Sequence, residues 1–209
     1  MLPLAGLQEN WINQNHSDQN VCRLPSLLAG ARCYTDASTT PDDPTSSTRK
    51  AGLGIFILDP TSQIKLFIKA QISQVNCVLM AEAAGIALAA SITSMLHIRN
   101  ISFLTDNQLL ASFFNGPDLC SPPRWDIKPF TQRFLNAVAN SSYRVLKIHR
   151  SSNNTAHLLA SQSYRAPELQ CNLANFTCSN VTHEGSCPLR EALRHVSWEP
   201  FSLIAASCC

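Results

Sequence analysis

Two segments of the sequence, Ala31-Arg32-Cys33-Tyr34-Thr35-Asp36 and Ile101-Ser102-Phe103-Leu104-Thr105-Asp106, run as strand-like stretches into the same Thr-Asp pair. Between them, Met80-Ala81-Glu82-Ala83 lies in an apolar stretch from Val78 to about Leu96 that is typical of a buried helix. Carboxylates on two strand ends and one helix can converge on one point, and Mg²⁺ is held in proteins by a few carboxylates together with phosphate oxygens of a substrate. The pattern predicts a metal-dependent site that acts on phosphodiesters.

Strands and helices alternate around these acids. The segment from Ser38 to Lys50 contains Pro, Asp and Ser residues that interrupt regular structure, and it is expected to be a loop. We expect strands at residues 31–36, 51–58, 64–70, 100–105 and 143–148, and helices at 78–96, 107–114, 127–140 and 155–164. With the two helices between residues 107 and 140 taken together, the order is βββαβαβα, which indicates an α/β fold.

Composition and charge place the chain among globular proteins. Of its 209 residues, 45% are hydrophobic and only 14% are charged, and the formal net charge is +2. The length suits one domain of about 130 to 150 residues with extended ends. Because non-specific affinity for nucleic acid comes from neutralised phosphates, a chain this weakly basic is expected to bind polyanions modestly.

The cysteines and the absence of targeting signals bear on the compartment. Nine cysteines, an odd number, are scattered along the chain. Residues 1–7 lack both the basic start and the apolar length of a secretory signal, so free thiols in a reducing, nuclear or cytoplasmic compartment are expected. No apolar run reaches about 18 residues without polar groups, so no membrane-spanning segment is predicted.

Cysteine and histidine residues near the C-terminus raise the question of a zinc site. The candidates are Cys171, Cys178 and Cys187, with His183 or His195. Their spacings lack the close pair, Cys-x₂₋₄-Cys, that is usual in zinc sites. The sequence therefore argues against zinc in this segment.

The chain divides into three regions. Residues 1–29 are rich in Asn, Gln, Ser and Pro and are interpreted as a linker or disordered N-terminal segment. Residues 30–166 contain the α/β pattern. Residues 167–209 mix Cys, Asn and Ser with two prolines and form a C-terminal tail of unknown function, to which no compact fold of its own is assigned.

Five motifs carry a resemblance to a known family. They are Tyr34–Ser38, Ala51–Gly54, Met80–Ala83, Leu104–Asn107 and Asn153–Ala160. In this order, and over residues 31–165, the chain resembles the type 1 ribonuclease H-like domains of plant retroelements and proteins derived from them. The resemblance implies a ribonuclease H-like α/β fold, a mixed five-stranded sheet with helices on both faces.

The resemblance also implies a chemistry, the hydrolysis of RNA in RNA–DNA hybrids with two Mg²⁺ or Mn²⁺ ions. Asp36 would bridge both ions, with Glu82 and Asp106 completing one side, because Mg²⁺ prefers hard oxygen ligands. Three further residues are implied to contact nucleic acid: Ser38, Asn107 and Asn153. The expected partner is an RNA–DNA hybrid or other nucleic acid, with no membrane, and the expected state is a monomer.

One position departs from the family pattern. Ribonucleases H usually carry a fourth acid on the last helix, in the pattern Asn-x-x-x-Asp-x-Leu-Ala, and His157 occupies that place as a catalytic candidate. Imidazole adds no negative charge and suits Mn²⁺ better than Mg²⁺, so one ion would be held less tightly. Two functions stay open, a weakened hybrid endoribonuclease and a catalytically silent, retroelement-derived module that binds nucleic acid or protein. An exonuclease or integrase variant of the fold is less favoured because its motif order differs.

Each of these residues also has a purely structural explanation. Asp106 could be a helix N-cap, Asp36 an ordinary turn acid, and His157 a surface residue. Glu82 is harder to explain in this way, because a lone carboxylate on an apolar helix is costly to bury without a partner or a metal. The three acids together favour an ancestral metal site.

A basic and aromatic stretch accompanies the site in the sequence. Its members are Arg124, Trp125, Lys128 and Arg133. They could touch the backbone of a hybrid, but the solvated face of an amphipathic helix explains them more simply.

Overall fold

The computed structural model describes residues 30–39, 49–166, 175–180, 183, 187–194 and 199–209. Its elements are β1 (Ala31–Thr39), β2 (Arg49–Asp59), β3 (Ile64–Val75), α2 (Val78–Met95), β4 (Asn100–Thr105), α3 (Gln108–Phe114), η2 (Trp125–Ile127), α4 (Lys128–Val138), β5 (Ser142–Lys147), η3 (Arg150–Ser152), α5 (Asn154–Arg165), β6 (Asn175–Cys178), α6 (Pro188–Arg194) and β7 (Phe201–Cys208). Every strand and helix expected between residues 31 and 165 is present, and β3 continues five residues beyond its predicted end at Ala70. The predicted linker, residues 1–29, lies outside the described residues.

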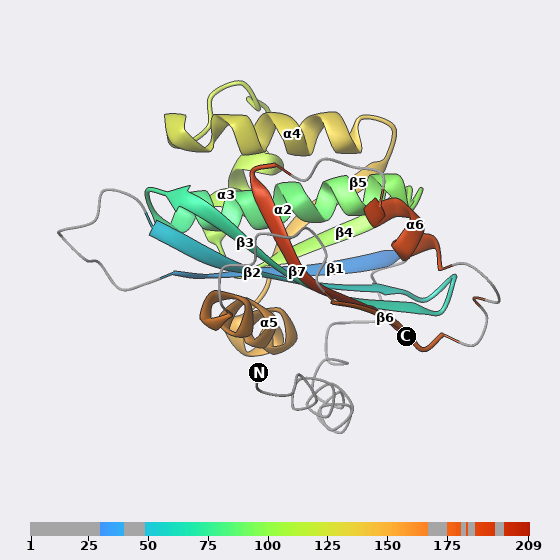
Figure 1. The fold of residues 1–209 in the computed structure, drawn as a ribbon. Coiled ribbons are helices and arrows are strands. Elements are labelled where there is room, and N and C mark those ends of the chain that lie inside the picture. The colour runs from blue at the N-terminus through green and yellow to red at the C-terminus, as the bar shows by residue number, and fades with distance from the viewer. Residues whose placement is uncertain (1–29, 40–48, 167–174, 181–182, 184–186, 195–198) are drawn as a thin grey trace.

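The strands form one mixed sheet in the order β5-β4-β1-β2-β3-β7-β6 (Figure 1). The pairs β1–β2, β2–β3 and β3–β7 are antiparallel, and β1–β4, β4–β5 and β6–β7 are parallel. The five strands from β5 to β3 are the predicted sheet, so the fold class is confirmed. The C-terminal tail, for which no fold was predicted, adds β7 and β6 to that sheet.

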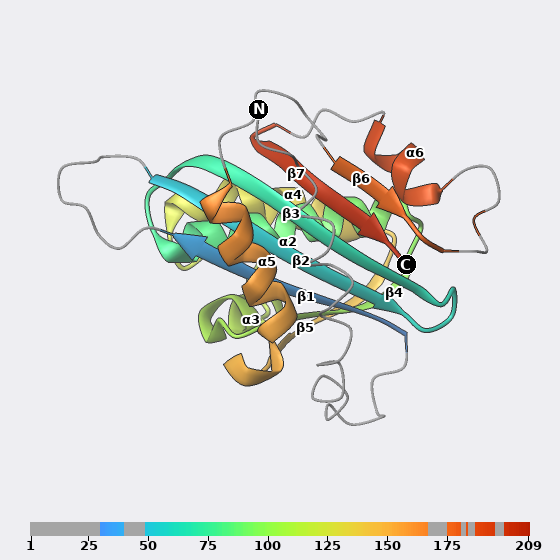
Figure 2. The same cartoon turned by 60° about the horizontal axis from the view of Figure 1, so that its bottom comes forward.

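Helices cover both faces of the sheet. In Figures 1 and 2, α2 and α4 lie on one face and α5 crosses the other, with α2 against β1 and β2 and α4 packed on α2. Because side chains alternate along a strand, Cys33 and Leu53 join the larger core beneath α2, whereas Tyr34 and Phe56 join a smaller core beneath α5. The rings of Tyr34 and Phe56 stack there with centroids 5.6 Å apart.

The helix α2 lies at the centre of the larger core. By length and composition it is apolar enough to cross a membrane, but 67% of its span is buried inside the protein. Ala and Gly residues let it approach the sheet closely, and Glu82 is its one charged residue. These features are those of the core helix of a globular domain.

The helix α5 packs unusually close to β2. A Cβ atom on Gly54 would overlap the backbone of Ala156, so only glycine permits this approach. The Ser163 hydroxyl donates to the Leu53 carbonyl at 3.0 Å, and the Gln71 amide donates to the Ser163 carbonyl at 2.6 Å. These contacts fix the height of α5 above the sheet and therefore the position of its side chains.

Candidate metal centre

Two of the predicted acids are positioned by the parallel pair β1 and β4. Tyr34 and Leu104 are the last paired residues, and Asp36 and Asp106 each lie two positions beyond them (36 − 34 and 106 − 104). Since parallel strands run in the same direction, both acids lie at the same end of the sheet. Asp36 does not end its strand as predicted, because β1 stays paired with β2 for three more residues, with Asp36 opposite Gly54.

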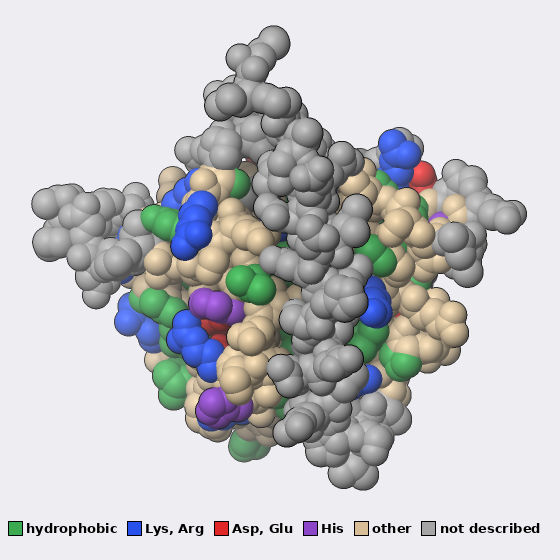
Figure 3. Space-filling model, turned by 90° about the horizontal axis from the view of Figure 1, so that it is seen from below, with side chains coloured by type: hydrophobic (Ala, Val, Ile, Leu, Met, Phe, Trp, Pro, Cys, Tyr) green, Lys and Arg blue, Asp and Glu red, His purple; other side chains and the backbone are tan. Residues whose placement is uncertain are grey.

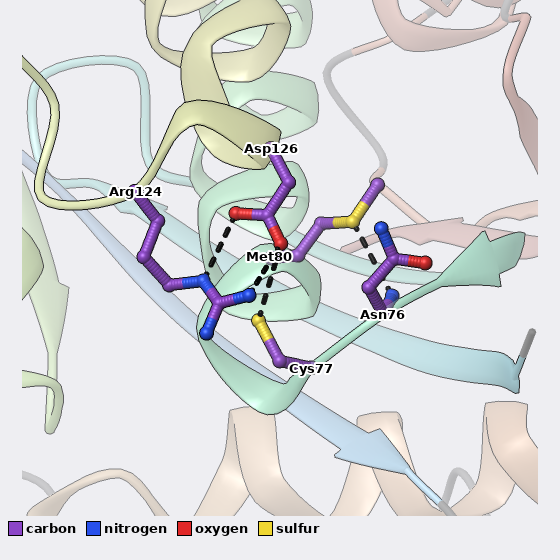
Figure 4. A network of polar contacts seen from close by, with 5 residues as sticks. All are labelled: Asn76, Cys77, Met80, Arg124 and Asp126. Carbon is purple, nitrogen blue, oxygen red and sulfur yellow. Dashed lines mark hydrogen bonds and ion pairs between the residues drawn. The ribbon is translucent and has the colours of Figure 1, made fainter. Parts of the chain in front are cut away.

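Glu82 reaches the same point from the second turn of α2. Cys77 is the N-cap of this helix but provides no side-chain capping bond. Figure 4 shows what holds the helix start instead: the Cys77 sulfur lies 3.9 Å from a carboxylate oxygen of Asp126, which also forms an ion pair with Arg124 at 3.0 Å. This network fixes the turn that precedes Glu82.

The three predicted carboxylates converge. One oxygen each of Asp36, Glu82 and Asp106 lies within 4.8 Å of the other two. Asp36 and Glu82 are each 5% exposed, so their charges are close together and largely shielded from water. Within the described part of the chain, Oε2 of Glu82 is buried and has no hydrogen-bond partner. An oxygen of this kind needs a cation or a proton, because burying it unpaired costs free energy.

Crowding changes the protonation of the site. Burial, and then the carboxylates of Asp36 and Asp106, raise the pKa of Glu82 well above its usual range. Burial also raises the pKa of Asp36, although its hydrogen bond with His157 acts in the opposite direction. A divalent cation favours ionised carboxylates and would relieve this repulsion.

His157 is part of the cluster rather than an isolated surface residue. Its Nδ1 lies 2.7 Å from Oδ2 of Asp36, and its side chain is 39% exposed. The histidine therefore engages one of the oxygens that the prediction assigned to metal binding.

The sequence of the chain matches a family over this same region. The sequence profile described as reverse transcriptase-like matches residues 43–163, which are 121 of the 209 residues (163 − 43 + 1). The chain belongs to the reverse transcriptase-like family. No curated protein matches the sequence as a relative.

Solved structures similar to this one are ribonucleases H and a reverse transcriptase. The N-terminal ribonuclease H domain of a Mycobacterium tuberculosis protein aligns with a TM-score of 0.55 at 15% identity, over 64% of this chain and 98% of that chain. LC11 ribonuclease H1, solved in complex with an RNA/DNA hybrid, gives 0.50 at 17% identity over 64% and 96%. The protease–reverse transcriptase of prototype foamy virus gives 0.54 at 18% identity over 69% of this chain but only 22% of that one. At these identities the likeness establishes a ribonuclease H-like fold.

Asp106 is not the helix cap. The helix α3 begins at Gln108 with Asn107 as its N-cap, and Oδ1 of Asn107 accepts a hydrogen bond from the Leu110 N–H at 3.2 Å. The capping role that could have explained Asp106 is thus filled by its neighbour. This leaves the Asp106 carboxylate to face the other two acids.

The residues predicted to contact nucleic acid are placed unequally. Asn153 is 1% exposed, and its Nδ2 donates to the Thr35 carbonyl at 2.8 Å, so it ties the start of α5 to β1. Its Oδ1 is buried without a hydrogen-bond partner among the described residues. Ser38 and Asn107 are close to Asp36 and Asp106 in the sequence, and both are partly buried. They remain candidates for contact with a nucleic acid.

The basic and aromatic residues of η2 and α4 mostly make contacts within the protein. Arg133 donates to the Glu199 carbonyl at 2.7 Å, and its guanidinium lies 5.0 Å from the centre of the Phe201 ring. The Lys128 ammonium lies 4.3 Å from the ring centre of Trp125, which is exposed. Arg133 therefore holds the residues at the start of β7 by these contacts and does not belong to an exposed basic surface.

Basic side chains do lie on the face where α5 packs. Figure 3 shows this face, with a small acidic surface beside a histidine and with Lys and Arg side chains close by. Lys and Arg side chains are the usual contacts of phosphate groups, and carboxylates are the usual ligands of hard cations.

The acids fit a hard divalent cation. Their donors are all carboxylate oxygens, as Mg²⁺ and Mn²⁺ require, and one of these oxygens is unpaired. There is also a second candidate group, against which the sequence prediction argued and from which it omitted Cys208. Its ligand atoms also lie within 4.8 Å of one another, and its members are Cys178, His183, Cys187 and Cys208.

Proposed function

We propose that this protein binds nucleic acid and hydrolyses the RNA strand of RNA–DNA hybrids with Mg²⁺ or Mn²⁺, at a rate lowered by His157 in place of a fourth acid. The observation that carries the proposal is the convergence of Asp36, Glu82 and Asp106 around the unpaired Oε2 of Glu82. The hybrid bound to LC11 ribonuclease H1, a protein of similar fold, supports this choice of substrate.

The chain prepares the site before any substrate arrives. Burial of Asp36 and Glu82 keeps water away from both carboxylates, and each attraction to a cation is stronger in that setting than in water. Asn153 and the close packing of α5 on Gly54 hold β1 in place, so Asp36 needs little reorganisation. Divalent cations held there would lower the pKa of a bound water and offset negative charge on the scissile phosphate. Ser38 and Asn107 would orient the nucleic-acid backbone.

His157 limits this arrangement. Its ring nitrogen engages Oδ2 of Asp36, the carboxylate assigned to bridge two cations. The histidine thus brings no additional anionic ligand and also competes for an existing one. Weak activity, with Mn²⁺ preferred over Mg²⁺, is the expected result.

The same contact supports the second candidate function, a silent module that retains the fold to bind nucleic acid or protein. A neutral or positive partner on Asp36 stabilises the carboxylate without metal, as a site no longer used for catalysis would allow.

Metal-dependent cleavage of a labelled RNA–DNA hybrid tests the proposal. We expect slow cleavage by the parent chain in Mn²⁺ and slower cleavage in Mg²⁺. His157→Asp is expected to raise the Mg²⁺-dependent rate at least tenfold by restoring an anionic ligand, and Asp106→Asn in that background is expected to abolish it.

Hybrid binding, measured in parallel, separates the two functions. If His157→Asp binds the hybrid and keeps its melting temperature but cleaves at background, the silent module is the better account. Absence of hybrid binding in the parent chain and in all variants would contradict the endoribonuclease and the nucleic-acid-binding form of the silent module.

We also propose the finer attributes that the motifs suggest. Their order supports an origin in a plant retroelement, and the free thiols support a reducing compartment, the nucleus or the cytoplasm. The protein is further proposed to be a monomer. Within the described residues, all seven cysteines are unpaired.

A further inference from the structure

A second cluster of side chains lies where β6, β7 and α6 meet. Cys178 ends β6, and its register partner on the parallel strand β7 is Cys208. Cys187 directly precedes α6, and His183 belongs to the connection between β6 and α6. The topology therefore brings three thiols and one imidazole together from four separate positions in the chain.

The distances within this cluster match tetrahedral coordination. A zinc ion binds sulfur at about 2.3 Å and nitrogen at about 2.0 Å, which places such ligand atoms about 3.5 Å apart at tetrahedral angles. Nδ1 of His183 lies 3.5 Å from the sulfur of Cys178 and 3.6 Å from that of Cys208. All four ligand atoms lie within 4.8 Å of one another.

The surroundings of the cluster are partly apolar and partly supply hydrogen-bond donors. Cys187 and Cys208 are buried. The backbone N–H groups of Arg190 and Leu189 face the Cys187 sulfur, as donors to a metal-bound thiolate do. Three polarisable sulfurs gathered in this way are stabilised by a soft or borderline cation.

The cluster also has an entry path. His183 and Cys208 line a cavity of about 440 Å³ that reaches the β2–β3 hairpin and the segment between α2 and β4. The protein itself supplies four ligands, which fill a tetrahedral coordination shell and leave no position for a substrate.

We infer that Cys178, His183, Cys187 and Cys208 form a structural Zn²⁺ site that fastens β6, α6 and β7 to the sheet. Binding converts three thiols to thiolates, with the imidazole neutral, and releases three protons to solvent for each Zn²⁺ bound. The sequence spacing hid this site because Cys208 lies 21 positions after Cys187 (208 − 187) and joins the others only through sheet pairing. Two earlier candidates, Cys171 and His195, lie outside the described residues.

Metal analysis of the full-length, reduced chain tests the site. We expect one Zn²⁺ per chain to survive dialysis into Mg²⁺ buffer, and Zn²⁺ to protect three of the nine thiols from alkylation. Mass spectrometry should place the protected thiols at Cys178, Cys187 and Cys208. Protection of none of these, or a disulfide joining two of them in the reduced chain, overturns the inference.

Variants supply the second arm. Co²⁺ added to the metal-free chain should give the intense visible absorption of tetrahedral thiolate coordination, and Cys208→Ser should lose it. Cys209→Ser, which changes the exposed neighbouring thiol, is the matched control and should retain the spectrum. His183→Cys should shift the spectrum without abolishing it, so a folding defect in Cys208→Ser does not prevent a decision. Weak octahedral absorption in the parent chain refutes the site.

Discussion

The carboxylate cluster (Asp36, Glu82 and Asp106) and the thiolate cluster (Cys178, His183, Cys187 and Cys208) lie on one sheet but differ in the ligand atoms that they offer. Asp36 on β1 and Cys208 on β7 are separated by β2 and β3. The first cluster offers three hard oxygen ligands and has a buried atom, Oε2 of Glu82, without a partner in the described part of the chain, whereas the second offers three sulfur atoms and one nitrogen. The difference teaches that three protein ligands leave coordination positions for water or substrate, whereas four would fill a tetrahedral shell.

Removing metal from the thiolate cluster should have the largest effect on stability. A zinc-selective chelator that leaves Mg²⁺ in place should lower the melting temperature of the full chain by about 10 °C, the equivalent of about 3 kcal/mol in a domain of this size. Scanning calorimetry of the parent chain and of Cys209→Ser checks this. If the chelator leaves both melting temperatures unchanged, the two clusters do not differ as argued.

The carboxylate site should depend on close backbone packing instead. Gly54→Ala would force α5 away from β2 and is expected to cost about 3 kcal/mol, because a Cβ there overlaps backbone rather than a flexible side chain. Gly85→Ala in α2 is the matched control: its added Cβ makes ordinary 3.9 Å contacts, so it should stabilise the chain by about 1 kcal/mol. Urea denaturation measures both, and equal effects would contradict the packing argument.

Glu82→Gln should separate stability from cation binding at the carboxylate cluster, because it is expected to raise the stability of the chain while removing a metal ligand. A neutral amide of the same shape avoids a buried charge beside two carboxylates, so the metal-free variant should be about 1 kcal/mol more stable than the parent near pH 7. Millimolar Mn²⁺ should raise the melting temperature of the parent and leave that of the variant unchanged. A variant that still responds to Mn²⁺ would show that the cation binds elsewhere.

Cys33 separates the effect of burying a thiol from that of binding zinc. Burial raises the pKa of this thiol above 9.0, so it stays neutral in the folded chain while the unfolded chain ionises. Its contribution is complete below pH 9 and is lost as the pH rises above that value. As the pH rises from 8 to 10, the free energy of unfolding of the parent should therefore fall by about 1 kcal/mol more than that of Cys33→Val. Identical pH profiles would show that this thiol does not contribute.

The fold and the carboxylate site could both be predicted from the sequence because both depend on local sequence patterns. Asp36 lies in, and Asp106 follows, a strand that the chain encodes locally, and a single parallel pairing brings the two acids close together. The burial of Glu82 on an apolar helix was equally local. His157 was identified by its motif position, but its hydrogen bond with Asp36 depends on the height of α5, which the glycines of β2 determine.

The features that escaped prediction depend on long-range contacts. Asn153 belongs to a motif associated with nucleic acid, and its Nδ2 also donates to the Thr35 carbonyl, 118 residues away in sequence. The pairing of β7 with β3 brings Cys208 to its partners, and no local spacing encodes that register.

The pairing of β7 also bears on whether the protein stays soluble. Without the C-terminal segment, β3 would present its unpaired backbone groups from Leu66 to Ile72 to any other chain, which invites edge-to-edge aggregation. With that segment in place, the edge strand on this side of the described sheet is β6, which is only four residues long. A chain shortened to end at residue 166 would keep all three acids and His157, and would be expected to self-associate through β3.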